Sequence, residues 1–573
     1  MSPSQRPVRV LVANRGEIAT RIIRTLHEMG CESVLPTLPD DSCGIAATLA
    51  SQAVLVDPRS EIFTDINEMV DFAVEHRADL VHPGYGFFAE DPKFVEKLAA
   101  HKIRFIGPNA ASMRTLGEKG QARKLAERLG IPTIPGIDQG NVKADSIRNF
   151  IEKHGYPFIF KRVDGGGGRG ITKIENARDL ETFFRVNEQS PEALTKYVVE
   201  KYLMRPRHIE TQCIVDVDAE PLILSTRECS VQRRNQKLVE EAPAINLTES
   251  NVARLHNYSK LLLKAAGYTN AGTCEFLVSN DNIYFLEVNP RIQVEHTVTE
   301  EITSIDLVRA QLEIALGKRV GLTEAQSGHA IEARITAEDL GSPTGTAGGQ
   351  ISRLQLPAGP GVRVETDAVL GCTITDRFDP LVAKVIAYGN TRDEALNRLQ
   401  RALNETVIEG PTTSLSTLRS LLDDSDFATS SYAVTTQWFE SDFLPRKTRL
   451  LQRQKQGPGA KTQTLVANDI PSVDPFSIQL RRTKYDALST LDQQTADGSV
   501  YAQRPCSVVA VTKHPGDVVL SGDVVLVTEV MKMEEKVCAP ISGRIVQSLK
   551  VGDRPRIGDL LLRIEKDKND EIE

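Results

Sequence analysis

Two glutamates near the middle of the chain constrain the fold more than any other feature. Alternating apolar and polar residues predict two short β-strands that start at Cys274 and Ile283 and form a hairpin. If Ser279 pairs with Ile283, then Glu275 faces Glu287, and facing residues hold their Cβ atoms about 5 Å apart. Two facing carboxylates repel each other unless a proton or a cation lies between them. A Mg²⁺ ion that also binds phosphate oxygens is the natural occupant, so the sequence predicts a metal site on this hairpin.

Downstream of this hairpin, polar side chains continue with a period of two. The row consists of Glu287, Asn289, Arg291, Gln293 and Glu295. Apolar residues alternate with it, and Pro290 favours an extended backbone at the preceding residue. A solvated strand face usually shows lysine and threonine rather than two carboxylates, two amides and a guanidinium. The row is therefore predicted to be one face of an extended segment in a binding site.

Four consecutive glycines, 165–168, lie between two strand-like runs within 156–174. Glycine lets backbone N–H groups approach phosphate oxygens closely and form an anion-binding concavity. The pattern is not a P-loop, because GxxxxGK[ST] is absent and a strand follows. A flexible hairpin is the commoner explanation of such a turn, but Lys161 just upstream favours phosphate binding.

The first part of the chain alternates strands with helices. Val8–Ala13 is a buried-strand pattern, Glu17–Met29 follows as an amphipathic helix, and similar alternation continues to about residue 115. This pattern predicts a parallel α/β sheet. Residues 196–330 mix strands with long helices, and 328–440 is a further α+β stretch. A chain of 573 residues is too long for one core, so we expect three to five domains.

After Ser499 short valine-rich strands alternate with Gly-Asp turns. The segment 515–523 recurs at 551–559, which predicts a small sandwich with approximate twofold symmetry. Between the two copies, strands Val524–Val530 and Met533–Cys538 flank a two-residue tip formed by Met531 and Lys532. Exposed methionines at a turn are unfavourable for stability, although a surface lysine on a β-turn is the usual explanation of such a tip.

Composition and charge exclude several classes of function. The formal net charge of −8 argues against nucleic acid as the main partner, and the basic cluster 232–237 has acidic neighbours. No apolar run approaches the roughly 18 residues of a membrane span.

Eight scattered cysteines without a CxxC pair predict neither a disulfide framework nor a zinc site, and they favour a reducing compartment. The N-terminus leaves no room for a signal peptide, so the cytoplasm is expected. The segment 443–468 is basic and contains Gly-Pro-Gly, and it is interpreted as a linker, with a docking segment as the alternative.

Together these motifs resemble the biotin carboxylase family, and the match covers most of 1–440. The glycine loop resembles the lid of ATP-grasp enzymes, and Glu529–Glu534 resembles the biotinyl-lysine motif of biotin carboxyl carrier domains. Further matching stretches are 14–17, 82–87, 199–202, 206–208, 227–230, 232–234, 236–237 and 328–334. The whole chain is similar to the α subunit of an acyl-CoA carboxylase.

The resemblance implies a role for each site residue. ATP would be held by Lys119, Lys161, Gly165, Gly166, Gly167, Gly168, Arg169, Gly170, Glu200, Lys201, Tyr202, Leu203, His208, Gln232 and Asn235. Mg²⁺ (or Mn²⁺) would be bound by Glu275, Glu287 and Asn289, and bicarbonate by Lys237, Arg291, Gln293 and the backbone of Val294. Glu295 would be the base that deprotonates bicarbonate, Arg334 would stabilise the biotin enolate, and Lys532 would carry the biotin.

The implied reaction is the ATP-dependent formation of carboxyphosphate, which decays to CO₂ and phosphate, followed by carboxylation of biotin. The sequence departs from the family at several positions, which are Asn235, 35–50, 341–349, 378–380 and 504–506. None of these departures removes a metal ligand or the base, so the chain is predicted to be a divergent but active enzyme.

The expected architecture is an ATP-grasp biotin carboxylase of α/β and α+β class followed by a small all-β biotinyl domain. Its predicted parts are an N-terminal domain (1–115), an ATP-grasp domain (116–327, lid about 131–203), a C-terminal α+β domain (328–440), a linker (441–498) and a carrier (499–566). No room remains for a carboxyltransferase, so that reaction is expected on a separate β subunit. Biotin protein ligase and a homodimer through the carboxylase domain are also implied. Two alternatives remain, a pyruvate carboxylase-type subunit or a non-catalytic biotinylated scaffold, and the acyl-CoA acceptor stays open.

Overall fold

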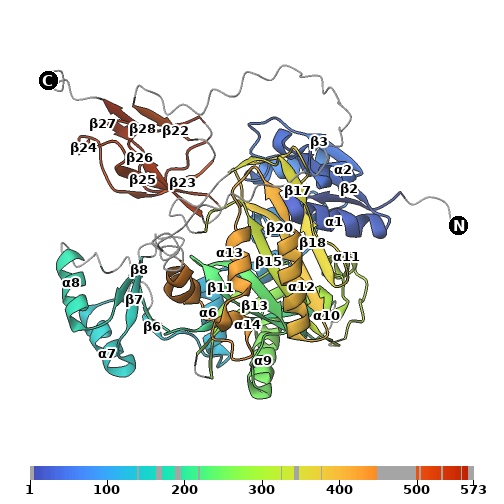
Figure 1. Ribbon diagram of the computed structural model, residues 1–573, viewed down its shortest axis with the longest axis horizontal. Helices are drawn as coiled ribbons and strands as arrows, with labels where there is room; N and C mark the ends of the chain where they lie inside the picture. Colours follow the sequence, from blue (N-terminus) through green and yellow to red (C-terminus); the bar gives the residue numbers. More distant parts are fainter. Residues whose placement is uncertain are drawn as a thin grey trace, which may run out of the picture. The chain divides into compact units, whose positions relative to one another are not determined.

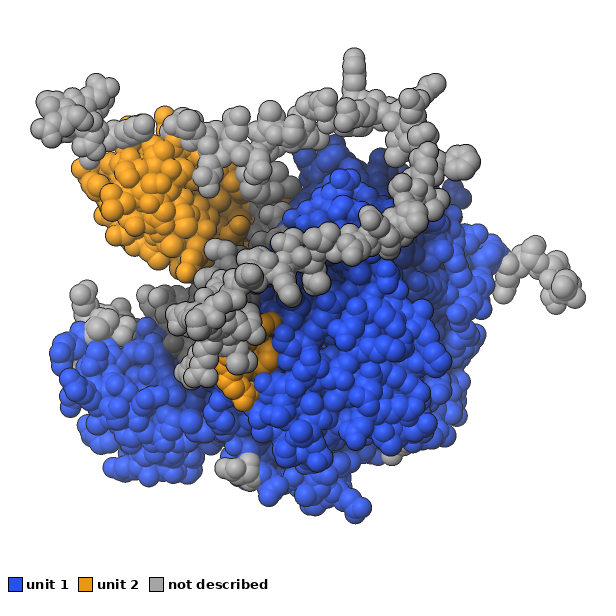
Figure 2. Space-filling model, viewed as in Figure 1, with its two compact units in different colours: residues 1–442 blue, residues 443–573 orange. Residues whose placement is uncertain are grey.

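The computed structural model describes most of the 573 residues. The described residues are 6–137, 141–162, 171–187, 194, 197–216, 220–279, 281–323, 325–340, 348–375, 377–447, 498–502, 505–530, 533–556 and 558–565. The chain divides into two compact units, Met1–Asp442 and Phe443–Glu573, which Figure 2 shows in blue and orange. Within the described ranges, no helix is both long enough and apolar enough to cross a bilayer.

The first unit begins with a five-stranded parallel sheet. Its strands are β1 (Arg9–Val12), β2 (Glu32–Thr37), β3 (Gln52–Leu55), β4 (Leu80–His82) and β5 (Arg104–Phe105), in the order β3-β2-β1-β4-β5. Buried side chains of α1 (Gly16–Glu28) pack on one core, and those of α3 (Ile66–Glu75) and α4 (Pro92–Ala100) pack on another. Shorter helices in this region are α2 (Ile45–Leu49), α5 (Ala110–Gly117) and α6 (Lys119–Arg128). The predicted parallel α/β sheet is confirmed.

A second, four-stranded sheet has its own small core. Its strands are β6 (Gly136–Ile137), β7 (Phe158–Arg162), β8 (Ile171–Ile174) and β9 (Tyr197–Lys201), in the order β6-β9-β7-β8. It packs with α7 (Ala144–His154) and α8 (Ala177–Asn187) around phenylalanine side chains (Figure 1). β7 and β8 pair antiparallel, as predicted for the strands beside the glycine loop, and the glycines 165–170 lie outside the described residues.

The largest sheet has eight antiparallel strands and runs through most of the first unit. In spatial order they are β14 (Asn282–Asn289), β13 (Asn270–Ser279), β10 (Arg207–Val215), β11 (Leu222–Arg233), β12 (Gln236–Ala242), β15 (His329–Thr336), β20 (Leu381–Gly389) and β18 (Val362–Thr366). The helices of this region include α9 (Glu249–Ala265), α10 (His296–Thr303), α11 (Leu307–Ala315), α12 (Arg392–Glu405) and α13 (Leu415–Leu422). Figure 1 shows α12 beside β15 and β20, on which it packs. Strands from the predicted third domain therefore continue the sheet of the predicted second domain.

The register of the β13–β14 hairpin corrects one step of the sequence argument. Ser279 pairs with Asn282 rather than with Ile283. A regular ladder with this register would put Glu275 opposite Leu286. A β-bulge next to Glu275 shifts the register by one residue, so Glu275 faces Glu287 as predicted. The conclusion is confirmed, but the bulge produces it.

A disulfide joins Cys43 to Cys372, which are 329 residues apart in the sequence. The scattered cysteines predicted no disulfide framework, and this prediction is wrong, because local cysteine spacing does not reveal a bond between distant segments. Cys43 follows the first turn after β2, and Cys372 precedes the short strand β19 (Thr373–Ile374). The bond therefore connects two segments that only the tertiary structure brings together.

The second unit is a two-sheet sandwich. One sheet has the order β22 (Ser499–Tyr501), β28 (Leu560–Glu565), β27 (Gly543–Ser548) and β24 (Val518–Val519), and the other has the order β23 (Ser507–Val511), β25 (Val524–Val530) and β26 (Met533–Cys538). Apolar side chains of both sheets form one core. The predicted sandwich is confirmed, and so is the predicted hairpin, in which Val530 pairs with Met533. Its tip, including Lys532, lies outside the described residues, as does 448–497 of the predicted linker.

The internal repeat is visible in the turns of this unit. Four aspartate side chains accept the backbone N–H three residues upstream. They are Asp517 (2.8 Å) and Asp523 (3.0 Å) in the first copy, and Asp553 (2.8 Å) and Asp559 (2.7 Å) in the second. The same turn chemistry recurs at the same offsets, which supports the approximate twofold symmetry.

Candidate active site

Neighbouring strands of the eight-stranded sheet bring the predicted site residues together. From one edge inward they are Glu287 and Asn289 on β14, Glu275 on β13, His208 on β10, Gln232 on β11, Lys237 on β12 and Arg334 on β15. These residues are spread over more than 120 positions of the sequence, yet they lie on six adjacent strands. An antiparallel sheet places them within a few side-chain lengths of one another.

Lys237 is the centre of the cluster. Its Nζ lies 2.7 Å from Glu210 Oε2 and 3.2 Å from Glu275 Oε1, and it also donates to Glu295. Burial favours the neutral amine, but these three carboxylates outweigh it and raise the pKa of Lys237 well above its usual value. Lys237 is therefore a permanent cation that lies against three buried carboxylates.

The predicted metal ligands form a second group beside it. Glu275 faces Glu287 in the sheet, and Asn289 Nδ2 donates to Glu275 Oε1 at 2.8 Å. His208 Nε2 lies 3.0 Å from Glu275 Oε2, and Lys119 Nζ lies 2.8 Å from Glu287 Oε2. Burial opposes ionisation of Glu275, but Lys237 and His208 lower its pKa well below the usual range. The facing carboxylates and the amide are an oxygen-rich donor set, and this set fits a divalent cation such as Mg²⁺.

The row from Glu287 to Glu295 is not one extended face, which corrects the sequence prediction. β14 ends at Asn289, and the chain then turns so that Glu295 occupies the N-cap position of α10. Gln293 nevertheless reaches the same place, because its Nε2 donates to Glu275 Oε1 at 2.7 Å. Its carboxamide oxygen accepts from Arg227 at 2.8 Å. The turn after β14 therefore brings the row together, and a strand period does not.

Arg291 lies at the rim of this cluster. Its Nε donates to Glu90 Oε1 at 2.7 Å, and its Nη2 donates to Asn289 Oδ1 at 3.0 Å. Although burial acts in the opposite direction, Glu90 raises the pKa of Arg291 above its usual value. The guanidinium is thus held between Glu90, in the connection from β4 to α4, and Asn289, one of the predicted metal ligands.

Glu295 and Arg334 form the opposite side of the cluster. Arg334 Nη2 lies 2.8 Å from Glu295 Oε2 and also contacts Glu240. Burial raises the pKa of Glu295, but Lys237 and Arg334 outweigh it and lower this pKa well below the usual range. Glu295 is therefore ionised at neutral pH, which is the state that a general base requires.

The residues predicted to hold ATP are divided among several places. Lys161 on β7 pairs with Glu200 on β9. The side chain of Lys201 instead donates to three carbonyls, of His154 (2.8 Å), Gly155 (3.2 Å) and Tyr156 (2.9 Å). Leu203 O accepts from Gln437 at 3.4 Å, and the Tyr202 ring lies 4.4 Å from the ammonium of Lys173. The backbone N–H groups of Lys201 and Tyr202 also donate, to Pro135 O (2.8 Å) and Pro157 O (3.2 Å), so both side chains and backbone hold this segment in place.

Two further predicted residues, Gln232 and Asn235, lie at one end of the β11–β12 hairpin. Gln232 Nε2 lies 2.7 Å from His208 Nδ1, so it belongs to the buried cluster. Asn235 is exposed at the tip of a two-residue turn, where both Arg234 and Asn235 have positive φ. Asparagine tolerates this left-handed conformation, so Asn235 fits the local backbone geometry.

Sequence reasoning missed Glu210 and Arg227, which lie under the cluster. Both are fully buried and form an ion pair, and Arg227 also donates to Gln212 at 2.6 Å. A signal existed in the sequence, because His208, Glu210 and Gln212 repeat with a period of two on one strand. This period of two identifies Glu210, but it does not identify Arg227, which lies on the next strand.

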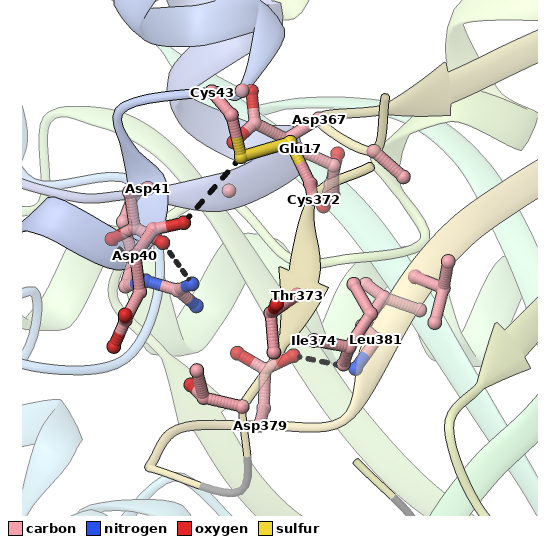
Figure 3. Close-up of a pocket in the computed structure, with 16 residues that line it drawn as sticks. Glu17, Asp40, Asp41, Cys43, Asp367, Cys372, Thr373, Ile374, Asp379 and Leu381 are labelled. Atoms are coloured by element: carbon pink, nitrogen blue, oxygen red, sulfur yellow. Dashed lines mark hydrogen bonds and ion pairs between the residues drawn. A yellow bond between two sulfur atoms is a disulfide. The ribbon is translucent and has the colours of Figure 1, made fainter. Parts of the chain in front are cut away.

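A small polar pocket lies beside the disulfide (Figure 3). Arg15 pairs with Asp41 there, and its guanidinium lies 4.4 Å from the centre of the Phe378 ring. Both Asp41 and Phe378 fall in segments where the sequence departs from the family pattern. Two of the departures therefore contact the same arginine.

Comparisons with known proteins divide the chain into four matched segments. The family models are biotin carboxylase N-terminal domain (7–113), carbamoyl-phosphate synthase L chain ATP-binding domain (118–323), biotin carboxylase C-terminal domain (332–441) and biotin-requiring enzyme (494–564). Together they cover both compact units.

Individual relatives match large parts of the chain. The biotin-dependent acyl-coenzyme A carboxylase alpha3 subunit of Mycobacterium leprae is 36% identical over 95% of this chain and 96% of its own length. A pyruvate carboxylase subunit from Methanothermobacter thermautotrophicus is 39% identical over 71% of this chain and 84% of its own. The biotin carboxylase domain dimer of Hydrogenobacter thermophilus 2-oxoglutarate carboxylase, solved with MgADP and bicarbonate, is 35% identical. Its TM-score is 0.69, and the match covers 76% of this chain and 98% of that one.

Proposed function

The chain belongs to the biotin-dependent carboxylases that join a biotin carboxylase to a biotinyl domain, and we propose that it carboxylates the biotin of its own carrier. This ATP- and bicarbonate-dependent step is the first half-reaction of an acyl-CoA carboxylase. The contacts of Lys237 with Glu210, Glu275 and Glu295 support the proposal, because they hold a permanent cation against the carboxylates to which we assign the roles of base and metal ligand.

We assign the nucleotide and the metal to one end of the cluster. Lys119, Lys161 and His208 are the cationic or hydrogen-bonding groups that would hold ATP, together with residues 200–203 and the loop 165–170. Glu275, Glu287 and Asn289 would bind Mg²⁺, which would neutralise phosphate charge when bound. Lys119 contacts Glu287 in the structure, so the same ammonium can turn to a phosphate oxygen once a cation takes over that carboxylate.

Bicarbonate would bind between Lys237, Arg291 and Gln293, with Glu295 as the base. While Lys237 and Arg334 contact Glu295, this carboxylate is a weak base because its pKa is held low. A bound anion that takes Lys237 as its partner separates this ion pair and raises the affinity of Glu295 for a proton. The geometry thus couples substrate binding to base strength.

Biotin would enter on the side of Arg334. A ureido nitrogen of biotin would there accept the carboxyl group. The guanidinium of Arg334 is half-buried, and its Nε has no hydrogen-bond partner among the described residues. We assign to Arg334 the stabilisation of the negative charge that develops on the ureido oxygen. Lys532 would be the attachment point, and the two described strands that flank it support this assignment.

The matched segments support the proposed division into 1–115, 116–327, 328–440, 441–498 and 499–566. The proposed partners are a carboxyltransferase β subunit, biotin protein ligase and a second copy of the carboxylase unit. The likeness to a pyruvate carboxylase subunit keeps that acceptor as the second candidate. The cytoplasmic location stays a prediction.

The test is ADP release by the purified protein with Mg-ATP, with and without bicarbonate and free biotin. We expect release to require both additions. Glu295→Gln and Arg291→Ala should each lower the stimulated rate by about 100-fold or more, because each removes a group that acts on the reacting anion. Glu220→Gln, which removes only one member of an exposed ion pair with Lys264, is the matched control.

Lys532→Ala should abolish recognition by avidin and leave the carboxylation of free biotin intact. Full activity in Glu295→Gln would refute the assignment of the base. A folded, avidin-positive protein that shows no stimulation at all would instead favour the biotinylated scaffold.

A further inference from the structure

Two buried carboxyl groups face each other beside the proposed biotin side of the site. Glu240 on β12 pairs in register with Glu332 on β15, and both are fully buried. Facing residues of an antiparallel pair are close neighbours, so two ionised carboxylates at these positions would repel each other strongly. None of the roles assigned above uses either residue.

The two carboxyl groups have different partners. Glu332 accepts a hydrogen bond from Thr297 on α10. Neither oxygen of Glu240 has a hydrogen-bond partner of good geometry among the described residues, and its one ion pair there is with Arg334. Glu240 therefore depends on Arg334, whereas Glu332 has an uncharged donor.

Arg334 is shared between two carboxyl groups through one nitrogen. The same Nη2 contacts Glu240 and lies 2.8 Å from Glu295 Oε2. Glu240 is on β12 and Glu295 is at the start of α10, so the guanidinium is clamped between two elements. If both carboxyl groups were ionised, they would neutralise the positive charge that Arg334 is expected to offer to biotin.

The groups that surround Glu240 come from four elements besides its own strand. They are Lys237 on β12, Cys229 on β11, Glu295 and Thr297 at α10, Glu332 and Arg334 on β15, and Lys384 on β20. Lys384 faces Arg334 in the sheet, but its Nζ is bound to Val294 O at 2.7 Å and lies 3.3 Å from Glu17 Oε2. No second cation contacts Glu240 among the described residues, which favours the protonated form of its carboxyl group. Burial and the repulsion of Glu332 and Glu295 outweigh the attraction of Arg334 and raise the pKa of Glu240 to about 8. Burial likewise raises the pKa of Glu332 to about 6.

We propose that Glu240 is a positioning residue for Arg334, and that the facing pair Glu240–Glu332 retains one proton at neutral pH. The neutral carboxyl group holds the guanidinium beside Glu295 without cancelling its charge. This inference rests on the proposed function, and it adds that the biotin step requires the shared proton. Loss of the shared proton at alkaline pH draws Arg334 toward Glu240 and weakens the biotin step, while the nucleotide side is left unchanged.

The experiment compares wild type with Glu240→Gln, Glu240→Ala and Glu241→Gln in the full-length protein, with free biotin as substrate, between about pH 6 and pH 10. Glutamine has the shape of the protonated carboxyl group and cannot ionise. Glu241 is the adjacent residue on the same strand, is equally buried, and pairs with His329 and Arg392 rather than with Arg334. Glu241→Gln therefore controls for the loss of a buried carboxylate as such.

We expect kcat/KM for biotin in wild type to fall at alkaline pH, with a midpoint near pH 8. In Glu240→Gln this fall should be absent, and kcat/KM at neutral pH should stay within about threefold of the wild-type value. Glu240→Ala should lower kcat/KM for biotin by about tenfold to 100-fold, because the guanidinium loses one side of its clamp. The KM for ATP should change less than about twofold in both variants. An unchanged alkaline limb in Glu240→Gln, or an equal loss in Glu241→Gln, would overturn the proposal.

A second readout does not depend on turnover. The infrared absorption of a protonated carboxylic acid should be present in wild type at neutral pH, should titrate away toward alkaline pH, and should be altered in Glu240→Gln but not in Glu241→Gln. If this band is found in a protein that shows no biotin-stimulated ADP release, the shared proton stands and the proposed function fails. If stimulation is found but the band is absent, the shared proton fails and the proposed function stands.

Discussion

Single charged residues in this site act on more than one neighbour. Lys237 contacts three carboxylates, and Arg334 contacts two. Removing one member of a buried ion pair leaves its partner charged and desolvated, at a cost of about 3 to 5 kcal/mol. Substitutions here therefore affect stability as well as activity.

A pH dependence of stability follows from His82 at the end of β4. This side chain is fully buried, its Nδ1 accepts from Gly84 N–H at 3.0 Å, and burial lowers its pKa to about 3. The unfolded chain binds a proton to this group below about pH 6.5, whereas the folded chain does so only near pH 3. The stability contributed by neutral His82 is thus present above about pH 6.5 and is lost as the pH falls toward 3.

We therefore expect His82→Asn to flatten the loss of thermal stability between about pH 6.5 and pH 4, by up to roughly 1.4 kcal/mol per pH unit. Thermal unfolding midpoints measured across this range provide the test, and the exposed His101→Asn is the control. Curves for His82→Asn that run parallel to wild type would contradict the prediction.

At the scale of elements, small irregularities decide where side chains end up. The bulge in β13–β14 restores the facing of Glu275 and Glu287, and the turn after Asn289 carries Gln293 and Glu295 back to the same cluster. A regular hairpin followed by a straight strand would have separated these groups. Bulges next to active sites commonly redirect side chains in this way.

The sandwich of the second unit offers a test of close backbone approach. A Cβ added at Gly543, where β27 begins, would lie 2.2 Å from the carbonyl oxygen of Glu565, whereas one added at Gly516 would meet nothing within 4 Å. Both glycines have positive φ, so a side chain strains the backbone at either position. We expect Gly543→Ala to destabilise the sandwich by at least about 2 kcal/mol more than Gly516→Ala, because only the first also displaces β28.

Hydrogen–deuterium exchange over β27 and β28 in the full-length protein measures this difference, since local opening reports the stability of these strands. Faster exchange in Gly543→Ala alone is the expected result. Equal exchange in the two variants would show that backbone strain, and not contact with Glu565, sets the cost.

At the scale of the whole molecule, distant parts of the sequence share structure. The eight-stranded sheet runs from β14, which carries Glu287 and Asn289, to β18. It therefore crosses the domain boundary proposed at residue 327. The disulfide joins Cys43, which follows β2 of the parallel sheet, to Cys372, which lies in the connection between β18 and β20 of this sheet. Closing a loop of this length restricts the unfolded chain, and disulfides typically stabilise by about 2 to 4 kcal/mol.

Alkylation of the denatured, unreduced protein should therefore block six of the eight cysteines, and all eight after reduction. Cys43→Ser and Cys372→Ser should each lower the thermal midpoint, and the double variant should lower it no further than the larger single effect, because both break one bond. Cys538→Ser, at an exposed free cysteine, is the control. Eight blocked cysteines without reduction would show that the bond is not formed.

Features that depend on local periodicity and local motifs could be predicted from the amino-acid sequence. The parallel sheet, the β7–β8 hairpin, the sandwich and the strands that flank Lys532 all follow from patterns a few residues long. The sequence also predicted that Glu275 faces Glu287. The predicted hairpin was regular, however, whereas the structure reaches the same pairing through a β-bulge.

Contacts between distant residues depend instead on how the elements pack. Glu210 and Arg227 under the cluster, Glu240 against Glu332, and Cys43 against Cys372 are pairs from separate elements, and no local pattern encodes their contact. The physical reason is that strand order and register are set by burial of the whole sheet. Hydrophobic alternation says that a residue faces the interior, but only the packed sheet decides which charge it faces there.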